Sequence, residues 1–186
     1  MGKPVVYIDG KEGTTGLQIY DRLAGWEDIQ LLLIDEDKRK DASERKRLMN
    51  EADLVFLCLP DAAAVEAVGL VENPATRIID ASTAHRTAPG WTYGFPELGA
   101  EQREAIRTAK RVANPGCYAT GFISLIAPLV RRGGLAPDAP LACHAISGYT
   151  GGGKKAIAQY EAEDREAELV SPRHYAVTLA HKHLPE

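Results

Sequence analysis

Up to residue 116 the sequence alternates between short strand-type runs and helix-type patterns. The strand-type runs fall at residues 5–8, 29–34, 54–59, 77–80 and 111–113. The helix-type patterns fall at 14–23, at 43–50, from 61 through an alanine-rich stretch, and at 97–110. The run at 54–59 is apolar throughout, which is typical of a strand buried on both faces. Strands that alternate with helices at this spacing predict a parallel sheet and an α/β fold.

After residue 116 the pattern changes. We expect a helix from Cys117 to about Arg132, because an apolar run follows the cysteine and Gly133 and Gly134 would end it. Beyond it we expect a strand at 141–146, a glycine-rich loop at 148–153, a helix at 154–169 and an extended segment at 173–183. The domain boundary is therefore placed at the cysteine, with one domain at 1–116 and the first part of a second at 117–186.

Composition narrows the class of protein. Hydrophobic residues make up 45% of the chain and charged residues 26%, which suits a globular protein with a real core. A net charge of -4 gives no general attraction to nucleic acid or to anionic membranes. No stretch approaches the ~20 apolar residues of a membrane span. The N-terminus runs straight into a predicted strand, so no signal peptide is expected.

The three cysteines, Cys58, Cys117 and Cys143, are widely spaced and odd in number. This usage fits a reducing cytoplasm better than a disulfide framework. Cys58 and Cys143 lie inside apolar runs, so we assign both to packing.

Cys117 follows an Asn-Pro-Gly turn and opens the predicted helix. Unpaired backbone N–H groups and the helix dipole at such a position favour the thiolate, which is the nucleophilic form. The same N–H groups can hold a phosphate or an oxyanion. The alternative is a buried thiol that acts as a small hydrophobic side chain.

A glycine loop joins the first predicted strand to the first predicted helix. Its glycines stand at Gly10, Gly13 and Gly16, where they permit a tight turn and close approach to a pyrophosphate. Asp35 follows Gly16 by 19 residues, near the spacing at which an acid contacts the ribose of NAD. Lys38, Arg39 and Lys40 follow and could hold the 2′-phosphate of NADP, so the residues alone leave both cofactors open.

Six segments in this order resemble one family. They are the glycine loop, Asp-Ala-Ser-Thr-Ala-His-Arg at 80–86, Tyr-Gly-Phe-Pro-Glu-Leu at 93–98, Ala-Asn-Pro-Gly-Cys-Tyr at 113–118, Ser-Gly-Tyr-Thr-Gly-Gly-Gly-Lys-Lys at 147–155 and His-Lys-His-Leu-Pro-Glu at 181–186. The chain resembles the N-acetyl-gamma-glutamyl-phosphate reductases of the shorter subtype. Aspartate-semialdehyde dehydrogenases share the general plan but match these segments less well.

The resemblance implies a Rossmann-type parallel sheet followed by part of an α+β catalytic and dimerisation domain. It implies NADPH-dependent reduction of N-acetyl-glutamyl 5-phosphate to the semialdehyde, with release of phosphate, in arginine biosynthesis. A small-molecule acyl phosphate is then the substrate, and a cytoplasmic homo-oligomer is expected for the full-length enzyme. Family members continue past a His-Leu-Pro-Glu segment, so we expect the chain to be the first part of such an enzyme.

A mechanism follows from the resemblance and the residues. The Cys117 thiolate would attack the acyl-phosphate carbonyl and form a thioester, which divides one difficult transfer into two steps. A histidine would move protons, since its titration lies nearest neutral pH. The His-Lys-His segment is favoured, with His183 preferred to His181. Extended backbone would place both on one face, and no metal is expected because no third ligand is evident at a recognisable spacing.

The remaining candidate residues are those expected to bind cofactor or substrate. Candidates for the cofactor site are Gly10, Gly13, Thr14, Thr15, Gly16, Lys38, Arg39, Ser82 and Gly148. Candidates for the substrate site are Arg86, Asn114 and Ser147. A guanidinium at position 86 would suit bidentate binding of a phosphate or carboxylate.

Two alternatives to the reductase stay open. One is a reductase for a related acyl phosphate, such as aspartyl phosphate or an aminoadipyl homologue. The other is a dinucleotide-binding fragment without turnover.

Overall fold

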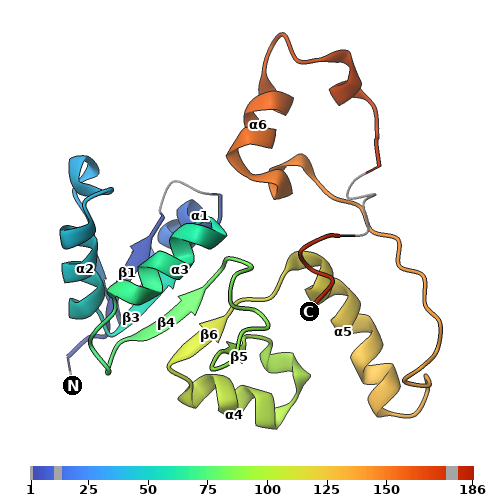
Figure 1. Cartoon of the computed structure of the whole chain (residues 1–186), viewed down its shortest axis with the longest axis horizontal. Helices are drawn as coiled ribbons and strands as arrows, with labels where there is room; N and C mark the ends of the chain where they lie inside the picture. Colours follow the sequence, from blue (N-terminus) through green and yellow to red (C-terminus); the bar gives the residue numbers. More distant parts are fainter. Residues whose placement is uncertain (1, 11–13, 175–179) are drawn as a thin grey trace. The chain divides into compact units, whose positions relative to one another are not determined.

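The computed structural model describes residues 2–10, 14–174 and 180–186, and of residues 14–17 it describes the backbone alone. The chain divides into two compact units (Figure 1). The first comprises residues 1–116 together with Glu186, and the second comprises residues 117–185.

The first unit is built on a parallel sheet. Its strands are β1 (Val5–Asp9), β2 (Gln30–Leu32), β3 (Leu54–Leu57), β4 (Arg77–Asp80), β5 (Thr92–Tyr93) and β6 (Arg111–Ala113). They lie in the order β2-β1-β3-β4-β6-β5, and every neighbouring pair is parallel. The direction of strand addition reverses between β1 and β3, as it does at the ligand-binding crevice of doubly wound sheets.

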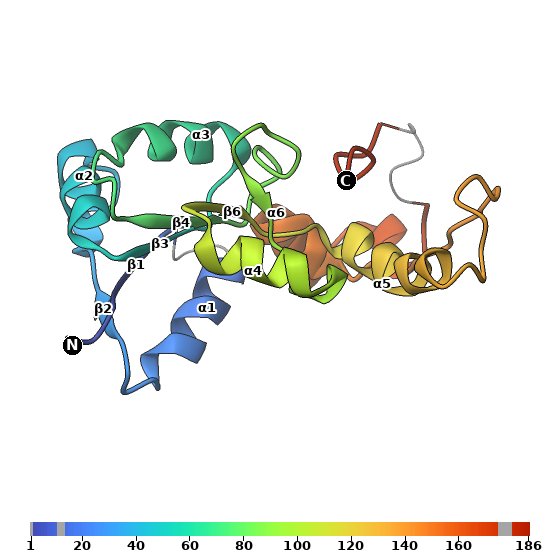
Figure 2. The same ribbon diagram turned by 90° about the horizontal axis from the view of Figure 1, so that it is seen from below.

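Helices cover both faces of this sheet. They are α1 (Thr14–Ala24), α2 (Ala42–Glu51), α3 (Asp61–Leu70) and α4 (Ala100–Thr108), with short 3-10 helices η1 (Glu36–Lys38) and η2 (Pro96–Leu98). Figure 2 shows α1 and α4 on one face and α2 and α3 on the other. Right-handed crossovers between parallel strands require this distribution for the observed strand order. The expected Rossmann-type α/β architecture is confirmed.

The core of the first unit lies between the sheet and the α2–α3 face. Its buried cluster consists of Tyr7, Leu48, Met49, Ala52, Val55, Leu57, Ala67 and Ile78. The sequence of α2 is polar except at Leu48 and Met49, which face this core. Asp41 accepts hydrogen bonds from the N–H groups of Ser43 and Glu44 and so fixes where the helix begins.

Two local features of the first unit differ from the sequence expectation. Strand β5 was not expected, because two residues give no periodicity to detect. The helix expected at 97–110 is divided into η2 and α4 by Gly99, whose φ of 141° no other residue type adopts readily. The expected strands at 77–80 and 111–113 are confirmed to the residue.

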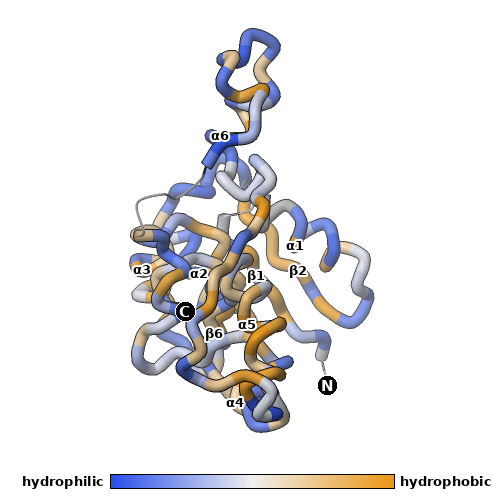
Figure 3. The backbone as a smooth tube through the Cα atoms, turned by 90° about the vertical axis from the view of Figure 1, so that its right-hand side faces the viewer, coloured by the Kyte–Doolittle hydropathy of each residue, from blue (hydrophilic) through white to orange (hydrophobic). Residues whose placement is uncertain are grey.

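The second unit is helical in its described part. It contains α5 (Cys117–Arg131), α6 (Gly153–Glu161) and the 3-10 helices η3 (Tyr149–Gly152) and η4 (Ala167–Val170). Helix α5 ends where Gly133 takes a φ of 69°, as the glycine pair predicted. Figure 3 shows hydrophobic stretches along α5.

Two expectations for the second unit are wrong. Residues 141–146 form no strand, because no other described segment pairs with them. The helix expected at 154–169 ends at Glu161, where acidic side chains three residues apart, such as Glu161 and Asp164, repel one another on a helix face. Residues 175–179 of the extended segment expected at 173–183 lie outside the described residues, and 182–185 form a turn.

Candidate active site

Cys117 is the first residue of α5, as predicted. Strand β6 ends at Ala113, the turn 114–116 follows, and the exposed thiol opens the helix. The first backbone N–H groups of any helix lack partners within it, so they point towards whatever binds at this end.

The turn before the cysteine is fixed by hydrogen bonds to three other segments. The Asn114 N–H donates to the Asp80 carbonyl at 2.7 Å, and the Asn114 carbonyl accepts from Arg86 Nε at 3.0 Å. The Gly116 N–H donates to Glu186 Oε2 at 2.8 Å. We call residues 114–116 the cysteine turn.

A buried cluster below this turn is organised by Asp80. Its carboxylate is fully buried and accepts from Ser82 Oγ at 2.6 Å and from the Ser82 N–H at 2.9 Å. His85 Nδ1 lies 2.6 Å from the same carboxylate, and the His85 ring stacks on Trp91 with centroids 4.1 Å apart. The Ser82 hydroxyl, a candidate for cofactor binding, is therefore bonded within the protein, and so is His85.

Arg86 follows this cluster and contacts the protein through all its guanidinium nitrogens. Nε donates to Asn114, Nη1 to Glu186 Oε1 at 2.7 Å, and Nη2 to the Ala81 carbonyl at 3.4 Å. Its side chain is 8% exposed. Arg86 thus links the loop after β4 to the cysteine turn.

Glu186 completes this network, although it was not singled out from the sequence. Its side chain is 1% exposed, and Oε2 also accepts from the Tyr93 hydroxyl at 2.9 Å. Burial raises the pKa of Glu186, but hydrogen bonds from Gly116, Arg86 and Tyr93 outweigh burial and hold that pKa below its ordinary value. The only signal in the sequence was its place in the His-Leu-Pro-Glu segment.

The two candidate histidines lie beside Tyr118, the residue that follows Cys117. The Tyr118 ring centroid is 5.5 Å from that of His181 and 5.6 Å from that of His183, and the two imidazoles are 4.6 Å apart. A turn produces this proximity, rather than the expected extended backbone, since the Leu184 N–H donates to the His181 carbonyl. The His183 N–H donates to His181 Nδ1 at 3.2 Å, so a neutral His181 carries its proton on Nε2.

Of the glycine loop, the structure describes Gly10, which directly follows β1 at the carboxyl edge of the sheet, and the backbone of residues 14–16. Gly10 has a φ of 90°, and a Cβ there would lie 2.3 Å from the Cys58 carbonyl oxygen. Glycine is therefore required for the chain to turn against the end of β3. Thr14, Thr15 and Gly16 belong to the first turn of α1, and Gly13 lies outside the described residues.

The cations after β2 are paired locally. Lys38 Nζ lies 3.1 Å from Asp35 Oδ2, and Arg39 Nε lies 3.2 Å from Glu36 Oε2. The hydrogen bond that Lys38 donates to the Asp35 carboxylate raises the pKa of Lys38. All four side chains are at the surface or close to it, where such pairs exchange readily.

In the second unit, Ser147 and Gly148 are exposed and precede η3. Cys143 is also exposed, so its assignment to packing is wrong; the strand that would have buried it does not form. Cys58 follows β3 and is half-buried, and burial, with smaller effects from Asp80 and Asp9, raises its pKa to about 12. The thiol of Cys58 is therefore protonated at neutral pH.

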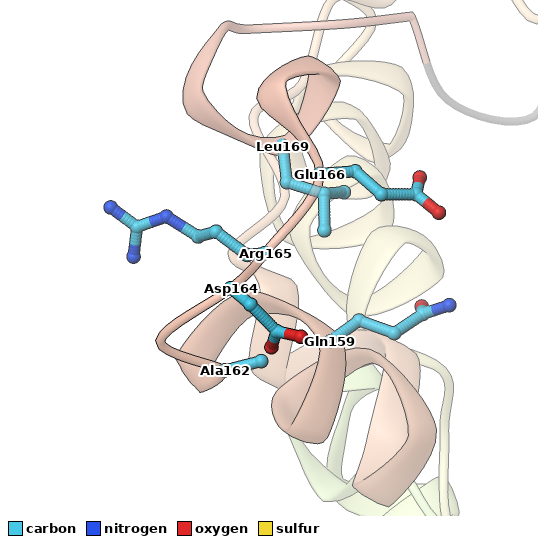
Figure 4. A pocket seen from close by; sticks show the side chains of 6 residues that line it. All are labelled: Gln159, Ala162, Asp164, Arg165, Glu166 and Leu169. Atoms are coloured by element: carbon cyan, nitrogen blue, oxygen red, sulfur yellow. The ribbon is translucent and has the colours of Figure 1, made fainter.

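The second unit contains a pocket of about 160 Å³. Figure 4 shows that the side chains of Arg165 and Glu166, which line it, point to opposite sides. Its lining residues are Gln159, Ala162, Asp164, Arg165, Glu166 and Leu169. None of these was predicted to be functional.

Among the described residues, no three histidine, cysteine, aspartate or glutamate side chains are grouped so that they could hold a metal ion. None of the helices within the described ranges is long and apolar enough to cross a membrane.

Comparison with known proteins gives the family. Residues 16–109 match the family described as semialdehyde dehydrogenase, NAD binding domain, and residues 117–186 match semialdehyde dehydrogenase, dimerisation domain. The chain belongs to the semialdehyde dehydrogenase family. Within that family, its parallel sheet is the NAD-binding domain, and Cys117 is the first residue matched to the dimerisation domain.

Curated relatives in this family are named as reductases. N-acetyl-gamma-glutamyl-phosphate reductase 2 of Pseudomonas putida is 53% identical over 100% of this chain, and the corresponding reductase of Burkholderia cenocepacia is 51% identical over 100% of it. The chain spans 59% of the length of each of these relatives.

A solved structure shows the same fold. Aspartate semialdehyde dehydrogenase II of Vibrio cholerae superposes with a TM-score of 0.63 over 94% of this chain and 55% of its own, at 15% identity.

Proposed function

We propose that the protein catalyses NADPH-dependent reduction of N-acetyl-glutamyl 5-phosphate to N-acetyl-glutamate 5-semialdehyde, with release of phosphate. The observation that carries this proposal is the exposed Cys117 at the start of α5, with two imidazoles beside the adjacent Tyr118. The identity of about one half to curated reductases over the whole chain supports this substrate.

The residues present fit a dinucleotide. The glycine loop and the first turn of α1 lie at the carboxyl edge of the sheet where strand order reverses, which is where such sheets bind ligands. The N–H groups at the start of α1 would hold the pyrophosphate, with Gly10, Gly13, Thr14, Thr15 and Gly16 around it. To hold the 2′-phosphate, Lys38 would exchange its ion pair with Asp35, and Arg39 its ion pair with Glu36, for contacts with the phosphate. Bound NADPH supplies the hydride.

Cys117 carries the covalent step. Its thiolate attacks the acyl carbon, the bond from that carbon to the phosphate oxygen breaks, and phosphate leaves with the bonding electrons. The product is a thioester on Sγ, which is reduced to the aldehyde as the thiolate is released. The N–H groups of the first turn of α5 would stabilise the oxyanion that forms at the acyl carbonyl.

A histidine would act as the general acid and base of the reaction. His183 is proposed as the acid and base, with His181 as its alternate, because both rings lie beside Tyr118. Arg86, Asn114 and Ser147 are proposed to bind the substrate, with Ser82 and Gly148 near the cofactor. For Arg86 this requires its Nη groups to exchange a protein acceptor for the substrate anion.

The proposal also covers the cellular compartment and the oligomeric state of the enzyme. Three widely spaced cysteines suit the cytoplasm, and the match to a dimerisation domain supports a homo-oligomer.

The test is to trap the thioester. The 186-residue chain is mixed with N-acetyl-glutamyl 5-phosphate without NADPH, and the intact protein is weighed by mass spectrometry. We expect an N-acetyl-glutamyl adduct on Cys117 that hydroxylamine releases as the hydroxamate. The Cys117→Ser chain should form it at least about 10³-fold more slowly, whereas Cys143→Ser, which removes the other exposed thiol, should match the unmodified chain.

The outcomes separate the alternatives. An adduct formed faster from aspartyl phosphate would assign a different acyl phosphate to the same chemistry. A chain that binds NADPH but acquires no acyl group from either donor would contradict the proposal and favour a dinucleotide-binding fragment.

A further inference from the structure

We propose that Glu186 is a positioning residue that fixes the cysteine turn, which leads directly into Cys117. This inference rests on the proposed role of Cys117. It concerns how the backbone before the thiol is held in place, not the chemistry that the thiol performs.

Both carboxylate oxygens of Glu186 are used, and the donors come from separate parts of the first unit. Oε1 accepts from Arg86 in the loop after β4, and Oε2 accepts from Tyr93 in β5 and from the Gly116 N–H. A carboxylate with 1% exposure is expensive to bury unless it is hydrogen-bonded in this way. Hydrogen bonds to a charged acceptor are also stronger than those to a neutral one.

Chain connectivity gives these contacts their consequence. Gly116 directly precedes Cys117. The bond from the Gly116 N–H to Glu186 Oε2 therefore fixes the backbone at the residue that leads into the thiol.

Arg86 and Tyr93 are suited to this role. Arg86 donates to the cysteine turn at Asn114 as well as to Glu186, so one guanidinium contacts both the turn and the carboxylate that fixes it. Burial, together with the bond to Glu186, raises the pKa of Tyr93, so its hydroxyl remains a donor at neutral pH. The lowered pKa of Glu186 keeps the acceptor charged there.

The test compares Glu186→Gln with Glu104→Gln by hydrogen exchange. Glutamine keeps the shape of Glu186 but loses the charge and places an NH₂ group among the donors. We expect amides of the 111–118 peptide to exchange at least about tenfold faster in Glu186→Gln. The peptide covering β3 should not change. Glu104 pairs only with Arg107 at the surface, so Glu104→Gln should leave both peptides unaltered.

A second measurement addresses position rather than stability. Glu186→Gln should slow thioester formation on Cys117 by about tenfold or more, with an unchanged Kd for NADPH. Tyr93→Phe removes one donor from Oε2 and should give a smaller increase in exchange at 111–118.

Two results would overturn the inference. In the first, amide exchange at 111–118 in Glu186→Gln matches that of the unmodified chain. In the second, exchange rises equally in the β3 and β4 peptides of Glu186→Gln, which would indicate a general loss of stability. If the unmodified chain forms no thioester, the proposed function fails, whereas the exchange comparison still decides the role of Glu186.

Discussion

At the scale of single residues, three buried carboxylates organise the first unit. Asp9 is paired with Arg45, Asp80 with Ser82 and His85, and Glu186 with Arg86. Each lies in or beside a segment predicted to be functional: the glycine loop, the loop after β4 and the cysteine turn. Burying a charge is costly unless it is paired and hydrogen-bonded, so each of these carboxylates needs the partner that folding brings to it.

Substitution of Arg45 tests how much its ion pair with Asp9 contributes to the free energy of unfolding. Its Nη2 lies 2.8 Å from Asp9 Oδ2, with the two side chains 12% and 6% exposed. Arg45→Met keeps the aliphatic stem but leaves the carboxylate buried without its cation, so we expect the free energy of unfolding to fall by about 3 kcal/mol. Urea unfolding followed by tryptophan fluorescence measures this, because both tryptophans, Trp26 and Trp91, lie in the first unit.

Arg47→Met is the matched control on the same helix. Arg47 pairs with Glu44 and Glu51 at the surface, where ion pairs contribute less than about 1 kcal/mol. Equal losses of unfolding free energy in Arg45→Met and Arg47→Met would show that the buried Asp9–Arg45 pair stabilises the protein no more than a surface pair does.

At the scale of elements, the glycine loop depends on one steric requirement. Gly10→Ala would combine a positive φ with a Cβ placed 2.3 Å from the Cys58 carbonyl. Gly90→Ala shares the positive φ, at 80°, but meets nothing within 4 Å. We expect the first variant to lower the free energy of unfolding by about 2 kcal/mol more than the second. Similar losses would mean that the loop can move away from β3.

The elements that the sequence predicted carry a local signal. Strand β3 was predicted because a strand buried on both faces is continuously apolar, and the end of helix α5 was predicted because glycines end helices. The strand at 141–146 and the long helix at 154–169 were wrong, since the first needs a pairing partner and the second carries repelling charges. Strand β5 is too short for any periodic signal.

At the scale of the whole molecule, the two units differ in how much core they contain. Among the described residues, every buried hydrophobic side chain except Ala119 belongs to the first unit. The second unit exposes large hydrophobic residues, including Leu125 at 71% and Ile146 at 90%. Stability follows buried apolar area, so it should be unevenly distributed between the units.

Hydrogen exchange across the whole chain tests this difference. We expect amides of β1, β3 and β4 to be protected at least about a hundredfold more than those of α5 and α6. Urea should likewise expose α5 before the tryptophan signal changes. Equal protection in both units would contradict an uneven distribution and indicate a single cooperative unit.

The sequence by itself determined the parallel sheet, the position of Cys117 at a helix start, and the candidate residues for the cofactor, because these depend on local pattern and spacing. Only the tertiary structure decided which polar groups meet: Arg86 with Glu186, His85 with Asp80, and the two imidazoles with Tyr118. Hydrogen bonds between residues as far apart as Gly116 and Glu186 leave no periodic trace in the chain. They arise when folding brings the ends of separate elements to one edge of the sheet, where a buried charge must find its partner.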